Sequence, residues 1–474
     1  MERLPLHFDP VSNGEYEPKP MSAAERSMKR IARELVDEGA RRTGVPRREF
    51  LTRLGGTAAC LLAINEVTAA RGGSFALGAG TLFDDDEASA TLRGDEFIFD
   101  IQGHHVMPDG GWEKHNELIA GTLRSLNMMR GGAADFGRYA FVKEIFLDSD
   151  TDCCVLSAVP STPEGSPLPP AEAENTRALV QGLGGSPRLW VHALATPNLG
   201  ELQPHLDGMD RTLAEFPIAA WKVYTLYHPD GGGYWLDSED IGMPFLEKVS
   251  EIGPKIVCMH KGIPLSGTTV HHTCRDVGVV AKRFEDIRFI CYHAGYNPGF
   301  AEGPYDPDNA SDGINALVKT LQDNEIAPNA NVYAELGSTW WMLMRNPEAA
   351  AHALGKLLKH VGEDNVLWGT DSVWYGSPQP QIAAFRAFEI SEELQELHGY
   401  PALTPELKAK VLGLNSARVY GIDPKAARPK LREDQLEKLR NAYLEEPSPS
   451  HRVYGPRTRR EFLDLLRSRD GMPA

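Results

Sequence analysis

Short apolar, β-branched runs alternate with longer segments of helical periodicity from residue 96 onward. Eight of the short runs are predicted as strands: "FIFDIQ", "CCVLSAV", "LWVHALA", "AAWKVYTLY", "KIVCMH", "IRFICYH", "NVYAEL" and "NVLWGTD". Segments between them, such as "AAAHALGKLLKHV", repeat apolar residues at helical spacing. Strand–helix alternation indicates a parallel sheet of the α/β class, and eight repeats favour a closed (β/α)8 TIM barrel over a doubly wound open sheet.

The residues outside the predicted barrel, which spans residues 96–423, follow other patterns. Residues 1–46 are predicted as an N-terminal arm, residues 47–72 as an export signal or a helix, and the acidic, glycine-rich residues 73–95 as a linker. Residues 424–474 are predicted as a charged helical C-terminal extension with a thin apolar stripe. Such an extension suits a homodimer, in which it would wrap the neighbouring subunit, and equally suits a solvated tail.

Arg47 and Arg48 open a stretch that resembles a twin-arginine export signal. The string "RREFL", a mildly apolar run and the small residues of "VTAARGG", where a peptidase could cut, follow in the expected order. The arginines lie unusually far from the N-terminus, and Asn65 and Glu66 interrupt the apolar run. A helical arm packed on the body of a cytoplasmic protein is therefore the alternative. We take a periplasmic or exported protein as the expectation.

The composition excludes several classes of partner. The 474 residues carry a formal net charge of −17 and no long basic run, which argues against nucleic acid and anionic membranes as partners. The sequence contains no stretch of 18 or more apolar residues, so no membrane span is expected. Two of the six cysteines, Cys258 and Cys291, stand two residues before histidines in apolar runs, and we interpret them as small buried side chains.

Polar side chains stand at the ends of four predicted strands. The first strand ends with Gln102 and His104, the fifth with His260, the sixth with His293 and the eighth with Asp371. A single histidine at a strand end is usually a hydrogen-bonded rim residue. In a barrel, however, the carboxyl ends of all strands meet at one rim, where the chemistry takes place. Imidazoles and a carboxylate that converge there are typical of a site for zinc or a similar divalent ion.

These strand ends also carry a family resemblance. The blocks are "FDIQGHH" for a D-x-H-x-H pattern, "VCMHKG", "FICYHAGY", "VLWGTDS" and the closing helix "LTPELKAKVLGLNSARVYGI". In this order they make residues 96–423 resemble the amidohydrolase-2 family. That family is the branch of the amidohydrolase superfamily that contains aminocarboxymuconate semialdehyde decarboxylase. The order and spacing of the blocks are specific for fold and family and much less specific for substrate.

The resemblance implies a metal centre and its catalytic residues. His104, His260 and Asp371 would bind one divalent metal ion, with Zn²⁺ as the expected metal and Mn²⁺ as the alternative. Asp371 would also be the proton acceptor, and His293 would hydrogen-bond the substrate or the reacting water. Physical chemistry agrees, because a divalent ion acidifies its bound water and a nearby carboxylate can accept the proton.

Gln102 departs from the family pattern, because it stands where the first histidine belongs. An amide oxygen can bind a divalent ion, but it is a weaker and harder donor than imidazole, which favours a manganese-like ion. Branches of the family that decarboxylate aromatic acids commonly have glutamate at this position. We expect Gln102 to be the fourth metal ligand. Ligation by His105 after a local bulge and a site without metal are the alternatives.

Four further residues are candidates for substrate binding: Lys222, Tyr224, Trp340 and Trp374. Aromatic walls suit a flat or apolar substrate with a few polar groups. Lys222 would hold a substrate carboxylate or a neighbouring acid. Binuclear members of the superfamily use a carboxylated lysine of this strand to bridge two metals, which is the alternative role.

Three functions remain open from the sequence. The first is hydrolysis of an amide, ester or lactone-like bond of a small, aromatic or carboxylate-bearing molecule by metal-activated water. The second is metal-dependent, non-oxidative decarboxylation of an aromatic or unsaturated acid. The third is a non-catalytic binding barrel, which the joint presence of His260, His293 and Asp371 argues against. We expect the hydrolase.

Overall fold

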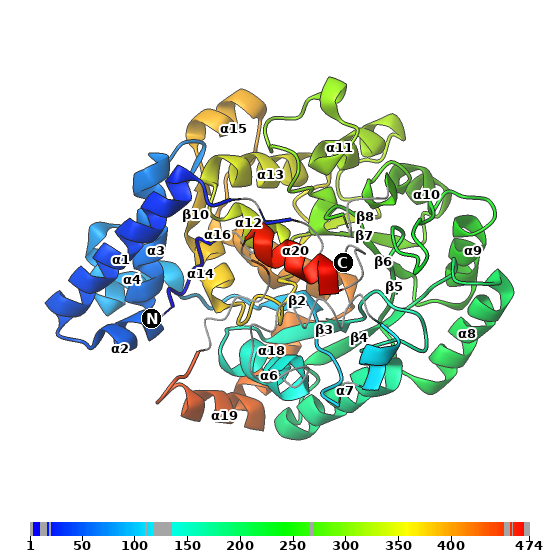
Figure 1. The fold of residues 1–474 in the computed structure, drawn as a ribbon, viewed down its shortest axis with the longest axis horizontal. Helices are drawn as coiled ribbons and strands as arrows, with labels where there is room; N and C mark the ends of the chain where they lie inside the picture. Colours follow the sequence, from blue (N-terminus) through cyan, green and yellow to red (C-terminus); the bar gives the residue numbers. More distant parts are fainter. Residues whose placement is uncertain are drawn as a thin grey trace.

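Eight parallel strands form the centre of the computed structural model (Figure 1), which describes residues 3–9, 17–18, 20–109, 111–116, 135–264, 270–449, 456 and 458–468. In chain order, which is also their order round the barrel, they are β2 (Phe99–Gly103), β3 (Cys153–Ser157), β4 (Leu189–Leu194), β5 (Ala220–Val223), β6 (Ile256–His260), β7 (Arg288–Tyr292), β8 (Val332–Glu335) and β9 (Val366–Leu367). The first and last strands meet where Ile101 N donates to Trp368 O over 3.0 Å and Gly103 pairs with Ser372. The predicted TIM barrel is therefore confirmed.

Helices cover the outside of the barrel (Figure 1). They include α6 (Arg138–Val142), α7 (Pro170–Gly184), α8 (Leu202–Glu215), α9 (Gly242–Ile252), α10 (Val277–Arg283), α11 (Gly313–Asp323), α12 (Thr339–Leu343), α13 (Pro347–His360), α14 (Gln379–Ala387), α15 (Glu392–His398), α16 (Pro405–Ala409) and α17 (Asn415–Val419). In α11, Ile314, Leu317 and Leu321 recur at helical spacing and are buried. Lys319 and Asp323 form an ion pair on its exposed side. This one-sided pattern is what seats such a helix on the sheet.

The N-terminal residues form a helical layer beside α14 (Figure 1). It contains α1 (Ala23–Thr43), α2 (Arg47–Thr52), α3 (Leu54–Thr68) and α4 (Asp85–Leu92). The segment that resembles an export signal is folded as α2 and α3, and Ala58, Cys60 and Ile64 of α3 are fully buried. Export through such a signal stays a prediction, and parts of the predicted arm lie outside the described residues.

Residues 73–95, which the sequence suggested to be a linker, contain regular structure. β1 (Gly73–Phe75) pairs antiparallel with β10 (Phe388–Ile390), and the rings of Phe75 and Phe388 pack edge to face with centroids 5.6 Å apart. Asp84 caps α4 by accepting hydrogen bonds from the backbone N–H groups of Asp86 and Glu87. The strand carries only one large apolar side chain, so its sequence lacks the alternation that identifies longer strands.

The C-terminal extension begins with two helices that pack on the chain's own barrel. α18 (Pro424–Glu433) and α19 (Gln435–Tyr443) are followed by α20 (Arg459–Ser468). Between α18 and α19, Asp434 accepts two hydrogen bonds from Arg188, at 2.9 and 3.0 Å, and each side chain is only 3% exposed. Arg188 also donates to Leu431 O over 2.6 Å. A homodimer stays a prediction.

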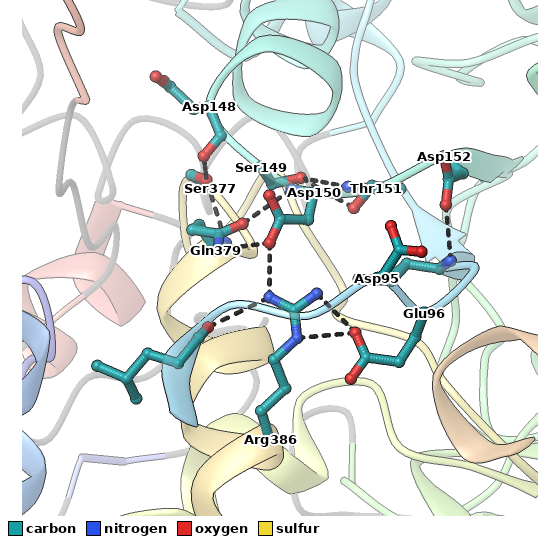
Figure 2. Close-up of polar contacts among 12 residues, drawn as sticks. Asp95, Glu96, Asp148, Ser149, Asp150, Thr151, Asp152, Ser377, Gln379 and Arg386 are labelled. Atoms are coloured by element: carbon teal, nitrogen blue, oxygen red, sulfur yellow. Dashed lines mark hydrogen bonds and ion pairs between the residues drawn. The ribbon is translucent and has the colours of Figure 1, made fainter. Parts of the chain in front are cut away.

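Arg386 of α14 links three further segments at the edge of the barrel (Figure 2). Its guanidinium donates to Glu96 over 2.9 and 3.1 Å, to Asp150 over 2.6 Å and to Leu92 O over 3.2 Å. From the C-terminal extension, Arg440 donates to the other carboxylate oxygen of Asp150 over 2.6 Å. Asp150 therefore ties α14 and the C-terminal extension to the segment before β3.

The helices and the cysteines bear on membrane insertion and thiol chemistry. Among the described helices, none is both long and apolar enough to cross a membrane. All six cysteines are buried and free, as expected for Cys258 and Cys291. Burial raises the pKa of the Cys258 thiol to about 12 and that of the Cys291 thiol well above its usual value, so these two thiols are unreactive at neutral pH.

Candidate functional site

Three of the predicted site residues meet where the first and last barrel strands lie side by side. Gln102 is in β2, His104 follows it, and Asp371 follows β9. His104 Nε2 lies 3.1 Å from Asp371 Oδ1, and Gln102 Nε2 donates to the same oxygen over 3.1 Å. Gln102 Nε2 and His104 Nε2 are 3.4 Å apart. All three side chains are buried, so the cluster is shielded from water.

Asp100 holds the two strands in this register. Its Oδ1 accepts hydrogen bonds from the backbone N–H groups of Gln102, at 3.0 Å, and Thr370, at 3.1 Å, and its Oδ2 accepts one from the Thr370 hydroxyl. Burial raises the pKa of Asp100 to about 7. This aspartate is the first residue of the "DIQGHH" block, and its role here is to join β2 to the segment that carries Asp371.

The imidazole of His104 has a defined tautomer. Its Nδ1 lies 2.8 Å from the carbonyl oxygen of Ser157, which can only accept a hydrogen bond, so Nδ1 carries the proton. In neutral His104 the lone pair of Nε2 therefore points at the Asp371 carboxylate. Two acceptors that face each other repel unless a proton or a cation lies between them. A metal-binding histidine typically has its second nitrogen fixed by a carbonyl in this way.

His260 and His293 form a second pair at neighbouring strand ends. His260 Nε2 lies 2.7 Å from Ile263 O, and His293 Nδ1 lies 2.7 Å from Gly337 O, so both of these nitrogens carry protons. The remaining nitrogens, His260 Nδ1 and His293 Nε2, face each other at 3.3 Å. Burial lowers the pKa of His293 to about 4 and that of His260 well below its usual value, so both rings are neutral at pH 7. Two lone pairs thus face each other.

The two pairs influence each other electrostatically. The carboxylate of Asp371 opposes the lowering of the His293 pKa. Burial raises the pKa of Asp371, whereas the neighbouring His104 and His293 imidazoles and the hydrogen bond from Ser338 bring that pKa below the usual value. Asp371 is therefore ionised at neutral pH, as a proton acceptor must be.

The backbone at this site adopts conformations that side chains disfavour. His293, Ala294, Ser338 and Asp371 have φ angles of 66°, 53°, 56° and 60°. Residues other than glycine rarely occupy the left-handed region, and such residues cluster at functional sites. The strand ends therefore turn sharply here, which aims the side chains of His293 and Asp371 inward.

The sequence reading missed two side chains that contact the cluster. Ser338 donates to Asp371 Oδ2, and its hydroxyl also lies 3.0 Å from Tyr375 OH. Glu335, at the end of β8, is fully buried and accepts hydrogen bonds from the backbone N–H groups of His293 and Gly337. Glu335 stands at the end of a strand, as the histidines do, so the glutamate in "NVYAEL" could have identified it as a candidate site residue from the sequence.

Lys222 and Tyr224 lie close to the histidine pair. Lys222 is fully buried, and its ammonium group stands 3.4 Å from the ring centroid of Tyr292 and 4.8 Å from that of Tyr224. Its charge contributes to the lowered pKa values of His260 and His293. The ring of Tyr224 packs against His260 with centroids 5.2 Å apart.

The two tryptophan candidates differ in position. Trp374 is half-buried and stacks on His104, with ring centroids 5.7 Å apart and 17° between the planes. Trp340 is only 1% exposed, packs edge to face on Phe385 and Phe388, and donates from its indole N–H to Gln381 O over 2.9 Å. Trp340 thus packs between α12 and α14, and its role in substrate binding stays a prediction.

His105 and Lys261 point away from the cluster. The ring of His105 packs against Phe141, and its Nε2 lies 2.8 Å from the hydroxyl of Thr176 in α7. Strand alternation from His104 explains this outward direction. Lys261 forms a fully buried ion pair with Asp276 and does not face solvent.

The chemistry of these donors fits a divalent metal ion. Within the described residues, no three histidine, cysteine, aspartate or glutamate side chains already converge closely enough to hold one. The unprotonated nitrogens of His104 and His260, the carboxylate of Asp371 and the buried Gln102 Oε1, which lacks a partner among the described residues, are all acceptors. A cation would satisfy them together. Gln102 would have to turn its amide oxygen inward.

The amidohydrolase family model matches residues 171–422, more than half of the chain. The chain belongs to the amidohydrolase-2 family. The matched range contains His260, His293 and Asp371, whereas Gln102 and His104 precede it. The resemblance inferred from the strand-end motifs is thus confirmed for this amidohydrolase.

Solved structures with a similar shape have low sequence identity to this amidohydrolase. An uncharacterised TIM-barrel protein from Bordetella bronchiseptica is 13% identical, with 68% of this chain and 98% of that chain covered and a TM-score of 0.44. The 5-carboxyvanillate decarboxylase LigW from Sphingomonas paucimobilis is 13% identical (69% and 100% covered, TM-score 0.45). A dihydroorotase from Campylobacter jejuni is 13% identical (69% and 84%, TM-score 0.37). No curated protein matches the sequence. Similarity at this level says nothing about the reaction.

Proposed function

We propose that this amidohydrolase is a metal-dependent hydrolase of a small organic molecule. The ligands of one divalent ion, Zn²⁺ or Mn²⁺, would be Gln102, His104, His260 and Asp371. The observation that supports this most directly is a pair of buried acceptors on two of these ligands, His104 Nε2 and Asp371 Oδ1, which face each other at 3.1 Å. A positive ion is the simplest group that makes such an arrangement favourable.

The side chains of the site have complementary roles in cleaving an amide, ester or lactone-like bond. A bound divalent ion would supply Lewis acidity, which polarises a substrate oxygen and acidifies water. Asp371 accepts the proton of the attacking water and returns it to the leaving group. Ser338 holds the other carboxylate oxygen of Asp371, which fixes its direction. The unprotonated Nε2 of His293 can accept a hydrogen bond from the reacting water.

The surroundings favour a flat substrate that carries a carboxylate. Trp374 offers an aromatic face beside His104. Lys222 brings a buried positive charge close to the histidines, which suits a substrate that carries a carboxylate. A carboxylate-bearing substrate would also suit the alternative reaction, non-oxidative decarboxylation, in which Asp371 would deliver its proton to carbon.

Metal content tests the proposal directly. We would purify the wild type and a His260→Ala/Asp371→Ala variant without chelator, incubate each with Zn²⁺ or Mn²⁺, remove excess metal and measure the metal by elemental mass spectrometry. The proposal predicts about one ion per chain in the wild type and a loss in the variant. His352→Ala serves as a matched control, because His352 is a buried histidine that bonds Tyr400 in a different part of the chain.

The outcomes separate the alternatives. Wild-type protein without metal under both conditions refutes the metal-dependent reaction. With metal present, amides, lactones and aromatic acids would be screened, and release of carbon dioxide in place of a hydrolysis product would favour the decarboxylase.

A further inference from the structure

Gln102 and Glu335 share a narrow space that two glycines leave open. A Cβ atom added to Gly337 would clash with Gln102 Oε1 and lie 2.5 Å from Glu335 Oε1. A Cβ atom added to Gly369 would clash with Glu335 Oε1 and lie 3.1 Å from Gln102 Cβ. The side chains of Gln102 and Glu335 thus fill the volume that a side chain at position 337 or 369 would need. Their positions are fixed by the backbone around them.

Glu335 retains hydrogen-bonding capacity on the side that faces this space. Its Oε2 accepts from His293 N over 3.1 Å, and its Oε1 accepts from Gly337 N. A carboxylate has about four lone-pair positions, and these two bonds use two of them. Glu335 can therefore accept a further N–H from a group in the shared space.

The Gln102 amide is oriented in the way that suits a site without a cation. Its Nε2 donates toward Asp371 Oδ1 and His104 Nε2, while Oε1 faces the space shared with Glu335 and has no partner among the described residues. A cation beside His104 and Asp371 would repel the N–H groups and attract the oxygen. Rotation of the amide by half a turn exchanges the two atoms at almost no steric cost.

We propose that Glu335 is a positioning residue that orients Gln102 as an oxygen ligand. In the rotated amide, Oε1 points toward His104 and Asp371, and Nε2 donates to the carboxylate of Glu335. This inference rests on the metal site proposed above, and it explains how a neutral glutamine can serve in that site.

A double-mutant cycle on metal affinity tests this role. The dissociation constant for Mn²⁺ would be measured by electron paramagnetic resonance for the wild type, Glu335→Gln, Gln102→Ala and the double variant. Residues that hydrogen-bond metal ligands typically contribute about tenfold or more to affinity, so Glu335→Gln should weaken binding by about tenfold. In the Gln102→Ala background, the same change should have no further effect.

The Gln102→Glu background gives an independent test with the opposite sign. A carboxylate introduced at position 102 would need a hydrogen-bond donor where Glu335 offers an acceptor, so adding Glu335→Gln, which supplies an N–H donor, should strengthen Mn²⁺ binding in this background. Glu302→Gln is the matched control, because Glu302 is a buried carboxylate paired with Lys356 elsewhere. Thermal melts of all variants report whether they are folded.

The outcomes are distinguishable. An unchanged Mn²⁺ affinity in Glu335→Gln, an equal loss in the Gln102→Ala background, or the same loss in Glu302→Gln would overturn the inference while leaving the metal site intact. A wild type that binds no metal would remove both this inference and the proposed function.

Discussion

Arg386 should be one of the most costly polar side chains to remove from this protein. Its side chain is only 2% exposed, and its guanidinium donates to Glu96, Asp150 and Leu92 O (Figure 2). Breaking a buried ion pair by removing one partner costs roughly 3–5 kcal/mol. The two carboxylates are 21% and 25% exposed and can be partly hydrated, which favours the lower end of that range. We expect Arg386→Met to lower the free energy of unfolding by about 3 kcal/mol.

Arg440→Met provides the matched comparison. Arg440 is 19% exposed, donates to Asp150 and to Ser149 O, and leaves Asp150 still bonded to Arg386 when it is removed. The loss of this more hydrated pair should cost about 1 kcal/mol. The difference of about 2 kcal/mol corresponds to roughly thirtyfold in the folding equilibrium.

Urea titration followed by tryptophan fluorescence and far-ultraviolet circular dichroism measures both values, provided that the two probes give coincident transitions. A change below about 0.5 kcal/mol for Arg386→Met would place it among ordinary surface substitutions and refute the reasoning. A larger loss of unfolding free energy for Arg440→Met than for Arg386→Met would also refute the reasoning.

Three further predictions concern the site and the fold. The Cβ atom of alanine at position 337 would clash with Gln102, so Gly337→Ala should abolish Mn²⁺ binding and lower the melting temperature. Gly182 lies at an open position of α7, so Gly182→Ala should instead stabilise the protein by up to about 1 kcal/mol. Burial lowers the pKa of His352 to about 4 while the unfolded imidazole titrates near 6.5, so the unfolding free energy should fall as the pH drops from about 6.5 to about 4. His352→Gln should reduce that slope in urea titrations; an unchanged slope would contradict the assignment. A chain lacking residues 1–72 loses α3 and exposes its buried contacts, so it should aggregate on size exclusion, and a soluble product with an unchanged melting temperature would contradict this.

The barrel was predictable because each strand is short, apolar and β-branched, and because the helices between strands show clear periodicity. The proximity of Gln102, His104 and Asp371 could also be predicted from the sequence, since the carboxyl ends of the strands in a closed barrel meet at one rim. The same rule applied to Glu335 would have found it. Only the strand register and the glycines opposite it show that this glutamate faces Gln102.

Other features depended on directions that the sequence does not encode. Trp340 and Trp341 are adjacent in a five-residue helix, and their side chains point to different partners: Trp340 packs on Phe385, whereas Trp341 stacks on Tyr375 with centroids 4.1 Å apart. Both indoles are buried, and composition could not predict which partner each of them contacts. The tautomers of the histidines likewise depend on carbonyl groups such as Ile263 O that become neighbours only after folding.

The closure of the barrel has a consequence for how the chain is made. β2 emerges early from the ribosome, but its open edge is paired only when Trp368 is available to accept from Ile101. Arg188 forms its ion pair even later in synthesis, because its carboxylate partner is Asp434. Until then the nascent chain carries an unpaired parallel strand and a cation without its counter-charge, both of which promote association between incomplete chains. A product that stops before Asp434 should therefore accumulate as aggregate even though all eight barrel strands have been synthesised.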